Sequence, residues 1–121
     1  MSYDPNNIFA KILDGSIPSS PVHETEYSFS FSDINPQAPT HDLVIPKGAY
    51  TDLTQFAEEG SDAELADWLR SLVAVAQKAG ITENGYRIIV NCGPDGHQEV
   101  PHLHGHVLGG RQLGFMIKRS D

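Results

Sequence analysis

The chain has 121 residues, of which 39% are hydrophobic, and this fits one folded domain spanning residues 1–121 with a single core. The formal net charge is −8 with only 8 lysine and arginine residues, which argues against a polymeric nucleic-acid partner but does not exclude a single nucleotide. The single cysteine, Cys92, excludes an intrachain disulfide and a zinc site built on a cysteine pair. We expect a cytoplasmic protein, because no apolar run approaches membrane-spanning length and the first residues lack a signal-peptide pattern.

The first half of the chain predicts a short helix followed by strands. Residues 1–7 are polar and are expected to be loosely ordered. Residues 8–13 carry apolar side chains at helical spacing and follow Asn7, which can cap a helix start. Residues 22–31 predict two short strands joined by a turn, because aromatic and serine side chains alternate toward their end. Residues 41–46 predict a third strand.

The second half predicts one long helix and two more strands. Ser61 and Glu64 have the spacing of a capping box, an apolar stripe at helical spacing follows, and Gly80 stands just past the last turn. Further strands are expected at residues 86–91 and 102–108. Strands clustered on either side of one long helix predict an α+β domain with a mostly antiparallel sheet.

The most unusual stretch is residues 100–110, which hold three of the chain's six histidines. His102, His104 and His106 occupy alternate positions, and in a strand alternate side chains project from one face. Each buried imidazole has two ring nitrogens that need partners, so a row of them is a costly way to build a core. We therefore interpret this row as a functional site.

Two kinds of chemistry fit this row. Neighbouring members lie about 6.6 Å apart along a strand, so either adjacent pair can share a metal ion, although all three converge only with a strong bend. Alternatively, the middle residue, His104, attacks phosphorus through one ring nitrogen while its other nitrogen donates a proton to a fixed acceptor. Residues 91–98 form a glycine-containing loop after a strand, which is typical of anion-binding sites.

Residues 100–110 resemble the signature of the histidine triad (HIT) superfamily, in which three histidines alternate with apolar residues. Other segments resemble its nucleotide-binding branch in the same order and at similar spacing, and together they extend over roughly residues 6–112. These segments are residues 7–12, 31–41, 43–47 and 85–91.

The resemblance implies a five-stranded antiparallel sheet with one long and one short helix, extended across a homodimer. It implies a purine nucleoside phosphoramidase or nucleotide hydrolase that acts on P–N, and possibly P–O–P, bonds of nucleoside 5′-phosphoryl compounds. The reaction would pass through a covalent nucleotidyl-histidine, with an AMP- or GMP-like ligand and no required metal or cofactor. The alternatives are a dinucleoside polyphosphate hydrolase, a nucleotide-binding regulatory protein with incidental hydrolysis, and a metal-binding protein.

The resemblance also implies roles for individual residues. His104 matches the nucleophile and His106 a contact to the α-phosphate, whereas His102 and His41 match supporting histidines. Asp33 matches the carboxylate that accepts hydrogen bonds from both ribose hydroxyls. The residues that match the base pocket are Ile8, Phe9, Ile12, Phe31, Ile34 and Leu43. Those expected on the phosphate side of the nucleotide are Asn91, Gln98 and Glu99.

Three positions depart from the family pattern. Glu99 stands where eukaryotic members carry a serine near the leaving group, and a carboxylate there repels a phosphate unless it is protonated or turned away. We therefore expect an altered rate or leaving-group preference. Gly105 replaces an apolar side chain on the face away from the site, where we expect lost packing. His97 is an added imidazole that we interpret as a solvated loop residue.

Overall fold

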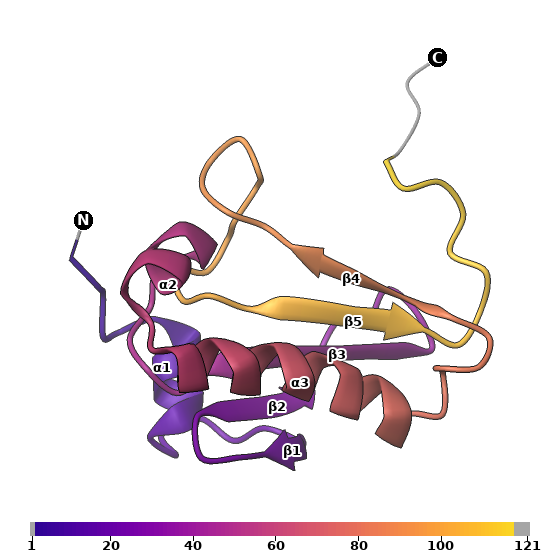
Figure 1. The fold of residues 1–121 in the computed structure, drawn as a ribbon, viewed down its shortest axis with the longest axis horizontal. Coiled ribbons are helices and arrows are strands. Elements are labelled where there is room, and N and C mark those ends of the chain that lie inside the picture. The colour runs from indigo at the N-terminus through magenta and orange to yellow at the C-terminus, as the bar shows by residue number, and fades with distance from the viewer. Residues whose placement is uncertain (1, 118–121) are drawn as a thin grey trace.

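The computed structural model describes residues 2–117, so Met1 and residues 118–121 of the expected domain lie outside it. The described residues form one five-stranded antiparallel sheet in the order β1-β2-β3-β5-β4 (Figure 1). The strands are β1 (Pro21–Glu24), β2 (Ser28–Ser32), β3 (Thr40–Pro46), β4 (Tyr86–Val90) and β5 (Gly105–Gly109). The helices are α1 (Ile8–Leu13), α2 (Leu53–Glu59) and α3 (Asp62–Lys78). The α+β class and the five-stranded antiparallel sheet are thus confirmed.

Capping side chains that the sequence had indicated explain where two helices begin. The side chain of Asn7 accepts from the Ala10 N–H at 2.9 Å and begins α1. Ser61 and Glu64 form the expected capping box, which satisfies two backbone donors at the start of α3. The sequence did not predict α2, which Asp52 caps by accepting from the Gln55 N–H. None of the described helices is long and apolar enough to cross a membrane.

The two faces of the sheet carry two different cores. The long helix α3 runs across one face (Figure 1), where Val44 and Val107 pack with Trp68 and Leu72. The opposite face is partly covered by α1 and carries a smaller cluster, which consists of Phe9, Phe31, Leu43 and Ile45. Because side chains alternate along β3, the odd-numbered residues of this strand belong to the second face.

The expectation that residues 102–108 form one strand is wrong for the first three residues, because β5 begins at Gly105. The carbonyl of Pro46 lies within 2.8 Å of His102 Nε2, and proline has no N–H with which to extend the ladder. The backbone of Leu103 instead donates to the Tyr50 carbonyl at 2.9 Å. The triad therefore spans a strand and the segment that leads into it, so its three side chains are not equivalent.

Gly105 lies on the face away from the site, as expected, and this face carries α3, but the expectation of lost packing there is wrong. A Cβ at this position would lie 2.8 Å from Leu72 Cδ2 and 3.2 Å from Trp68 Cζ2. The side chains of α3 already occupy the space, so the glycine permits a close approach of helix and strand.

Candidate active site

The strand register places two histidines together on the face opposite α3. His106 pairs with Leu43 across β5 and β3, and His41 lies two residues before Leu43 on the same face. The Nε2 atom of His41 lies 2.9 Å from Nδ1 of His106, and the ring centroids are 5.2 Å apart. His41, which the family resemblance matches to a supporting histidine, therefore lies directly beside the triad on the neighbouring strand β3.

The protonation of this pair follows from its partners. The backbone N–H of Gln37 donates to His41 Nδ1 at 3.0 Å, so that nitrogen holds a lone pair and the ring proton lies on Nε2. This proton points at His106 Nδ1 at 2.9 Å, with Asp33 Oδ2 at 3.4 Å from the same nitrogen. His106 Nδ1 is consequently the acceptor, and His106 Nε2 carries a proton. Among residues 2–117 this Nε2 makes no hydrogen bond, so it is a free donor.

The protonation of His104 is fixed in the opposite sense. Its Nδ1 lies 2.8 Å from the backbone carbonyl of His102. A carbonyl only accepts, so Nδ1 must donate, and the lone pair of the neutral ring is on Nε2. No other described residue hydrogen-bonds to Nε2. The ring of His104 is only 5.1 Å from that of His106, measured between centroids, so a nucleophilic nitrogen and a hydrogen-bond donor stand side by side.

His102 is entirely buried, with 0% of its surface exposed, and acts as a support. Its Nε2 donates to the Pro46 carbonyl at 2.8 Å, and its Nδ1 accepts from the Tyr3 hydroxyl at 2.6 Å. Tyr3 belongs to the segment that we expected to be loose, and that expectation is wrong for this residue. A single tyrosine near a terminus carries no sequence signal that would have identified this partner.

Burial keeps the triad neutral. Burial lowers the pKa of His102 from 6.5 to about 4, against the Pro46 hydrogen bond, which raises it. The pKa of His106 is also lowered to about 4, mainly by burial and in part by the nearby His104 and His41 rings, against the charges of Asp33 and Glu99, which raise it. The pKa of His104 is also lowered by burial, although the hydrogen bond to the His102 carbonyl and the charges of Asp33 and Glu99 raise it. Near neutral pH, His104 Nε2 therefore keeps its lone pair.

A cavity of about 550 Å³ opens in front of His104 and His106. Eleven of the residues expected at the site line it, in segments that are far apart in the sequence. They are Ile8, Phe9, Ile12, Phe31, Asp33, Ile34, Leu43, Asn91, Glu99, His104 and His106. The sequence analysis did not place seven other lining residues there, namely Ile17, Pro18, Ser19, Ser32, Asn35, His97 and Val100. The ring of Phe9 packs edge-on against His104 with centroids 4.9 Å apart, so α1 forms one wall.

Three expected site residues do not line the cavity: His41 and His102, which support the other histidines, and Gln98. The side-chain amide of Gln98 donates to the carbonyls of Thr51 and Val100 at 2.7 and 3.0 Å, and its oxygen accepts from the Gly93 N–H at 3.0 Å. All of these bonds are to backbone groups. In this structure Gln98 therefore stabilises the loop that leads from β4 to the triad and does not face the cavity.

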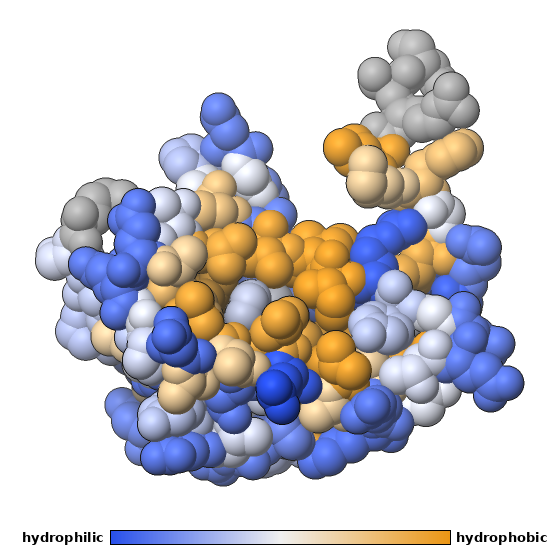
Figure 2. Space-filling model, in the orientation of Figure 1, coloured by the Kyte–Doolittle hydropathy of each residue, from blue (hydrophilic) through white to orange (hydrophobic). Residues whose placement is uncertain are grey.

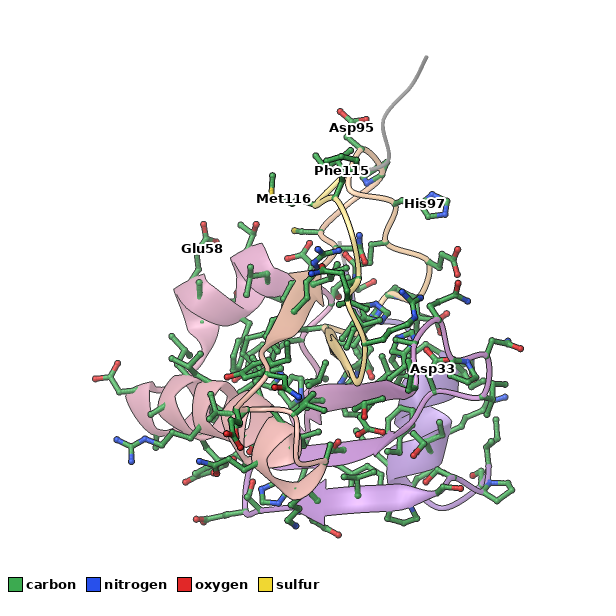
Figure 3. All side chains as sticks on the ribbon, turned by 90° about the vertical axis from the view of Figure 1, so that its right-hand side faces the viewer. Asp33, Glu58, Asp95, His97, Phe115 and Met116 are labelled. Carbon is green, nitrogen blue, oxygen red and sulfur yellow. The ribbon has the colours of Figure 1, made fainter. Side chains whose placement is uncertain are left out.

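His97 and Glu99 stand at the mouth of the cavity. His97 Nε2 lies 3.0 Å from Glu99 Oε1, and the two side chains are 85% and 76% exposed. The backbone of His97 has a φ of 60°, a conformation that residues other than glycine rarely adopt. Figure 3 shows His97 on the loop after β4, on the same side of the molecule as Asp33, with Asp95 at the tip of that loop.

The carboxylate of Asp33 and the rings of His41 and His106 form the group of described residues with the spacing for a metal ion, with one ligand atom from each within 4.8 Å of the others. The hydrogen bonds argue against that use. His41 Nδ1 accepts from the Gln37 N–H, so a neutral His41 keeps its proton on the nitrogen that would have to bind the ion. The arrangement fits a hydrogen-bonded relay better than a metal centre.

A second hollow of about 760 Å³ lies between the end of α3, the start of β4 and the C-terminal segment. Among residues 2–117, no histidine or carboxylate lines it, and the guanidinium groups of Arg87 and Arg111 on its wall already donate to backbone carbonyls. The smaller cavity is therefore the site with reactive groups.

Replacing Tyr3 with phenylalanine should lower the free energy of unfolding by about 1–3 kcal/mol, because it leaves the buried Nδ1 of His102 without its donor. Urea denaturation measures the change. The matched control is Tyr27→Phe, which removes a hydroxyl that makes no hydrogen bond among residues 2–117 and should change stability by less than about 0.5 kcal/mol. Equal effects of the two substitutions would contradict the role of Tyr3.

The free energy of unfolding should fall as the pH is lowered from 6.5 toward 5. The unfolded chain binds protons on its histidines near pH 6.5, whereas folded His102 and His106 bind them only near pH 4. In this window the unfolded state holds more protons, so stability rises with pH. Denaturant titrations at a series of pH values measure the slope, and a flat or inverted profile between pH 6.5 and 5 would contradict the burial of neutral imidazoles.

Comparisons with known proteins agree with this geometry. The family model of the HIT domain matches residues 14–113. An uncharacterized HIT-like protein of Azospirillum brasilense is 58% identical over 119 residues, which cover 98% of each chain. The purine nucleoside phosphoramidase of Escherichia coli K12 is 42% identical over 110 residues, covering 91% of this chain and 92% of the relative. The crystal structure of a HIT family hydrolase from Legionella pneumophila superposes with a TM-score of 0.85 at 41% identity and covers 92% of this chain and 98% of the other. The chain therefore belongs to the HIT domain family.

Proposed function

We propose that this protein is a purine nucleoside phosphoramidase, which hydrolyses the P–N bond of nucleoside 5′-phosphoramidates through a nucleotidyl-His104 intermediate. The family and its relatives support a hydrolase. The observation that carries the proposal is the fixed tautomer of His104, which aims an unprotonated Nε2 into the cavity beside a free N–H of His106.

The nucleotide fits the cavity by its chemistry. The apolar side chains of α1, with Phe31 and Leu43, offer a surface for a purine ring. Asp33 is half-buried at the edge of this surface and offers carboxylate oxygens to ribose hydroxyls. The N–H of His106 then meets a phosphate oxygen next to His104.

The reaction has two balanced steps. The lone pair of His104 Nε2 forms a bond to the α-phosphorus, the substrate P–N bond breaks, and the departing nitrogen takes its electron pair and one proton from solvent at the open mouth. Water then attacks the phosphorus, the bond to the imidazole breaks, and one proton returns to solvent. The sum is phosphoramidate plus water giving nucleotide plus amine, with His104 regenerated.

Replacing His104 with alanine should lower turnover of an adenosine phosphoramidate by more than about a thousandfold, because it removes the nitrogen lone pair that forms the intermediate. Nucleotide binding, measured by calorimetry with AMP, should largely remain, and the nucleotidyl adduct seen by mass spectrometry after rapid quenching should disappear. His23→Gln, which changes a histidine outside the cavity, is the control. Turnover that survives His104→Ala would show that His104 is not the nucleophile.

We also propose a homodimer. Leu69 and Val73 lie one turn apart on α3 and are 61% and 39% exposed, and Ile89 on the edge strand β4 is 37% exposed. Ile89 pairs with His106, so its side chain lies on the face of the sheet opposite α3. Figure 2 shows apolar residues gathered over α3 and the neighbouring strands β5 and β4, on the α3 side of the sheet. A second copy that covers this area would remove an exposed apolar face and an unpaired strand edge.

Light scattering should therefore give a mass of about twice 13.2 kDa. Leu69→Glu should shift the protein to 13.2 kDa by placing a charge in the contact, whereas Leu69→Met keeps an apolar side chain and should remain dimeric. A wild-type mass of 13.2 kDa at micromolar concentration would refute the dimer.

A further inference from the structure

The cavity has an uneven charge distribution that bears on the leaving group. Among the described residues that line it, the charged side chains are two carboxylates, Asp33 and Glu99, and none is a lysine or an arginine. Asp33 comes from the segment between β2 and β3, and Glu99 comes from the segment between β4 and β5. The phosphate is thus met by neutral imidazoles rather than by cations.

The two carboxylates differ in depth. The side chain of Asp33 is 20% exposed and lies beside His41, whereas that of Glu99 is 76% exposed and lies at the mouth. A nucleotide that occupies the inner, apolar part of the cavity leaves only the mouth for the group on the far side of phosphorus. Because the entering and leaving atoms stand roughly in line at phosphorus, that group departs toward solvent, where Glu99 stands.

We propose that Glu99 makes this site selective for phosphoramidates whose leaving amine carries a second, positively charged group, and disfavours anionic leaving groups such as polyphosphates. This rests on the proposed phosphoramidase function and names its substrate class. An ammonium group about four bonds beyond the leaving nitrogen reaches toward a carboxylate at the mouth, whereas a nucleoside polyphosphate brings several negative charges to a cavity in which no described lining residue is a lysine or an arginine.

His97 helps to hold Glu99 in place. A carboxylate accepts only, so the 3.0 Å contact requires that His97 Nε2 donates to Glu99 Oε1. His97 makes this contact from a backbone conformation with φ at 60°, which is rare for a residue with a Cβ. The carboxylate is therefore oriented at the mouth by a neighbour on the same loop.

The test compares three adenosine 5′-phosphoramidates that share the nucleotide and differ at the end of the amine. The amines are 1,3-diaminopropane, butylamine and 4-aminobutanoate, which end in a cation, a methyl group and an anion. Values of kcat/KM are measured for the wild type, Glu99→Gln and Asp95→Asn. Asp95 is the matched control, since it removes the same charge from the same loop but does not line the cavity (Figure 3). For each protein, kcat/KM for the cationic substrate is divided by kcat/KM for the neutral substrate. The wild-type value of this ratio is then divided by the value for the variant, and this double ratio cancels the intrinsic reactivity of each amine.

For Glu99→Gln this double ratio should be about fivefold in favour of the wild type, the factor that corresponds to a good solvent-exposed ion pair, and it should shrink in high salt. The anionic substrate should shift in the opposite direction. For Asp95→Asn the double ratio should stay near one.

The leaving-group proposal falls if the double ratio for Glu99→Gln is near one, or if Asp95→Asn changes it equally. If the wild type turns over the neutral substrate through His104 in that case, the phosphoramidase proposal stands alone. If the wild type turns over none of the three substrates, both proposals are refuted.

Discussion

The site depends on one hydrogen bond, from Nδ1 of His104 to the backbone carbonyl of His102 at 2.8 Å. A backbone carbonyl cannot titrate or exchange donor and acceptor roles, so it fixes the tautomer wherever the fold persists. The position of this carbonyl is fixed because both ring nitrogens of His102 are hydrogen-bonded, Nε2 to the Pro46 carbonyl at the end of β3 and Nδ1 to the Tyr3 hydroxyl. The end of a strand and the N-terminal segment thus determine where the lone pair of His104 points.

A second chain of hydrogen bonds runs from Gln37 through His41 to His106, beside His104. The Gln37 N–H sets the tautomer of His41, and His41 in turn sets the tautomer of His106. The free Nε2 of His106 is therefore a donor, whereas the free Nε2 of His104 is an acceptor. This complementary pair suits a phosphorus centre, where one nitrogen attacks and the other binds an oxygen. Burial lowers the pKa of both rings and keeps the pair in these roles near neutral pH.

The sequence predicted those features whose causes are local. The caps of α1 and α3 depend on side chains within three residues of the helix start, and the strands follow from alternation. The family resemblance supplied the expected members of the site and a separate role for each histidine, but not the hydrogen bonds that set their tautomers. The end of the β3–β5 ladder at Val44 and Gly105, the hydrogen bond from Tyr3 to His102 and the hydrogen bonds of Gln98 to the loop all depend on groups brought together by tertiary folding. No pattern within a single segment encodes such contacts.

The tautomer of His104 tests this account most directly. Long-range proton–nitrogen NMR correlation on nitrogen-15-labelled protein at pH 7 distinguishes protonated from unprotonated ring nitrogens. The account predicts a neutral His104 with its proton on Nδ1 and an unprotonated Nε2, and a neutral His106 with its proton on Nε2. A His104 ring protonated on Nε2, or on both nitrogens, would contradict the role of the His102 carbonyl and with it the assignment of His104 as the nucleophile.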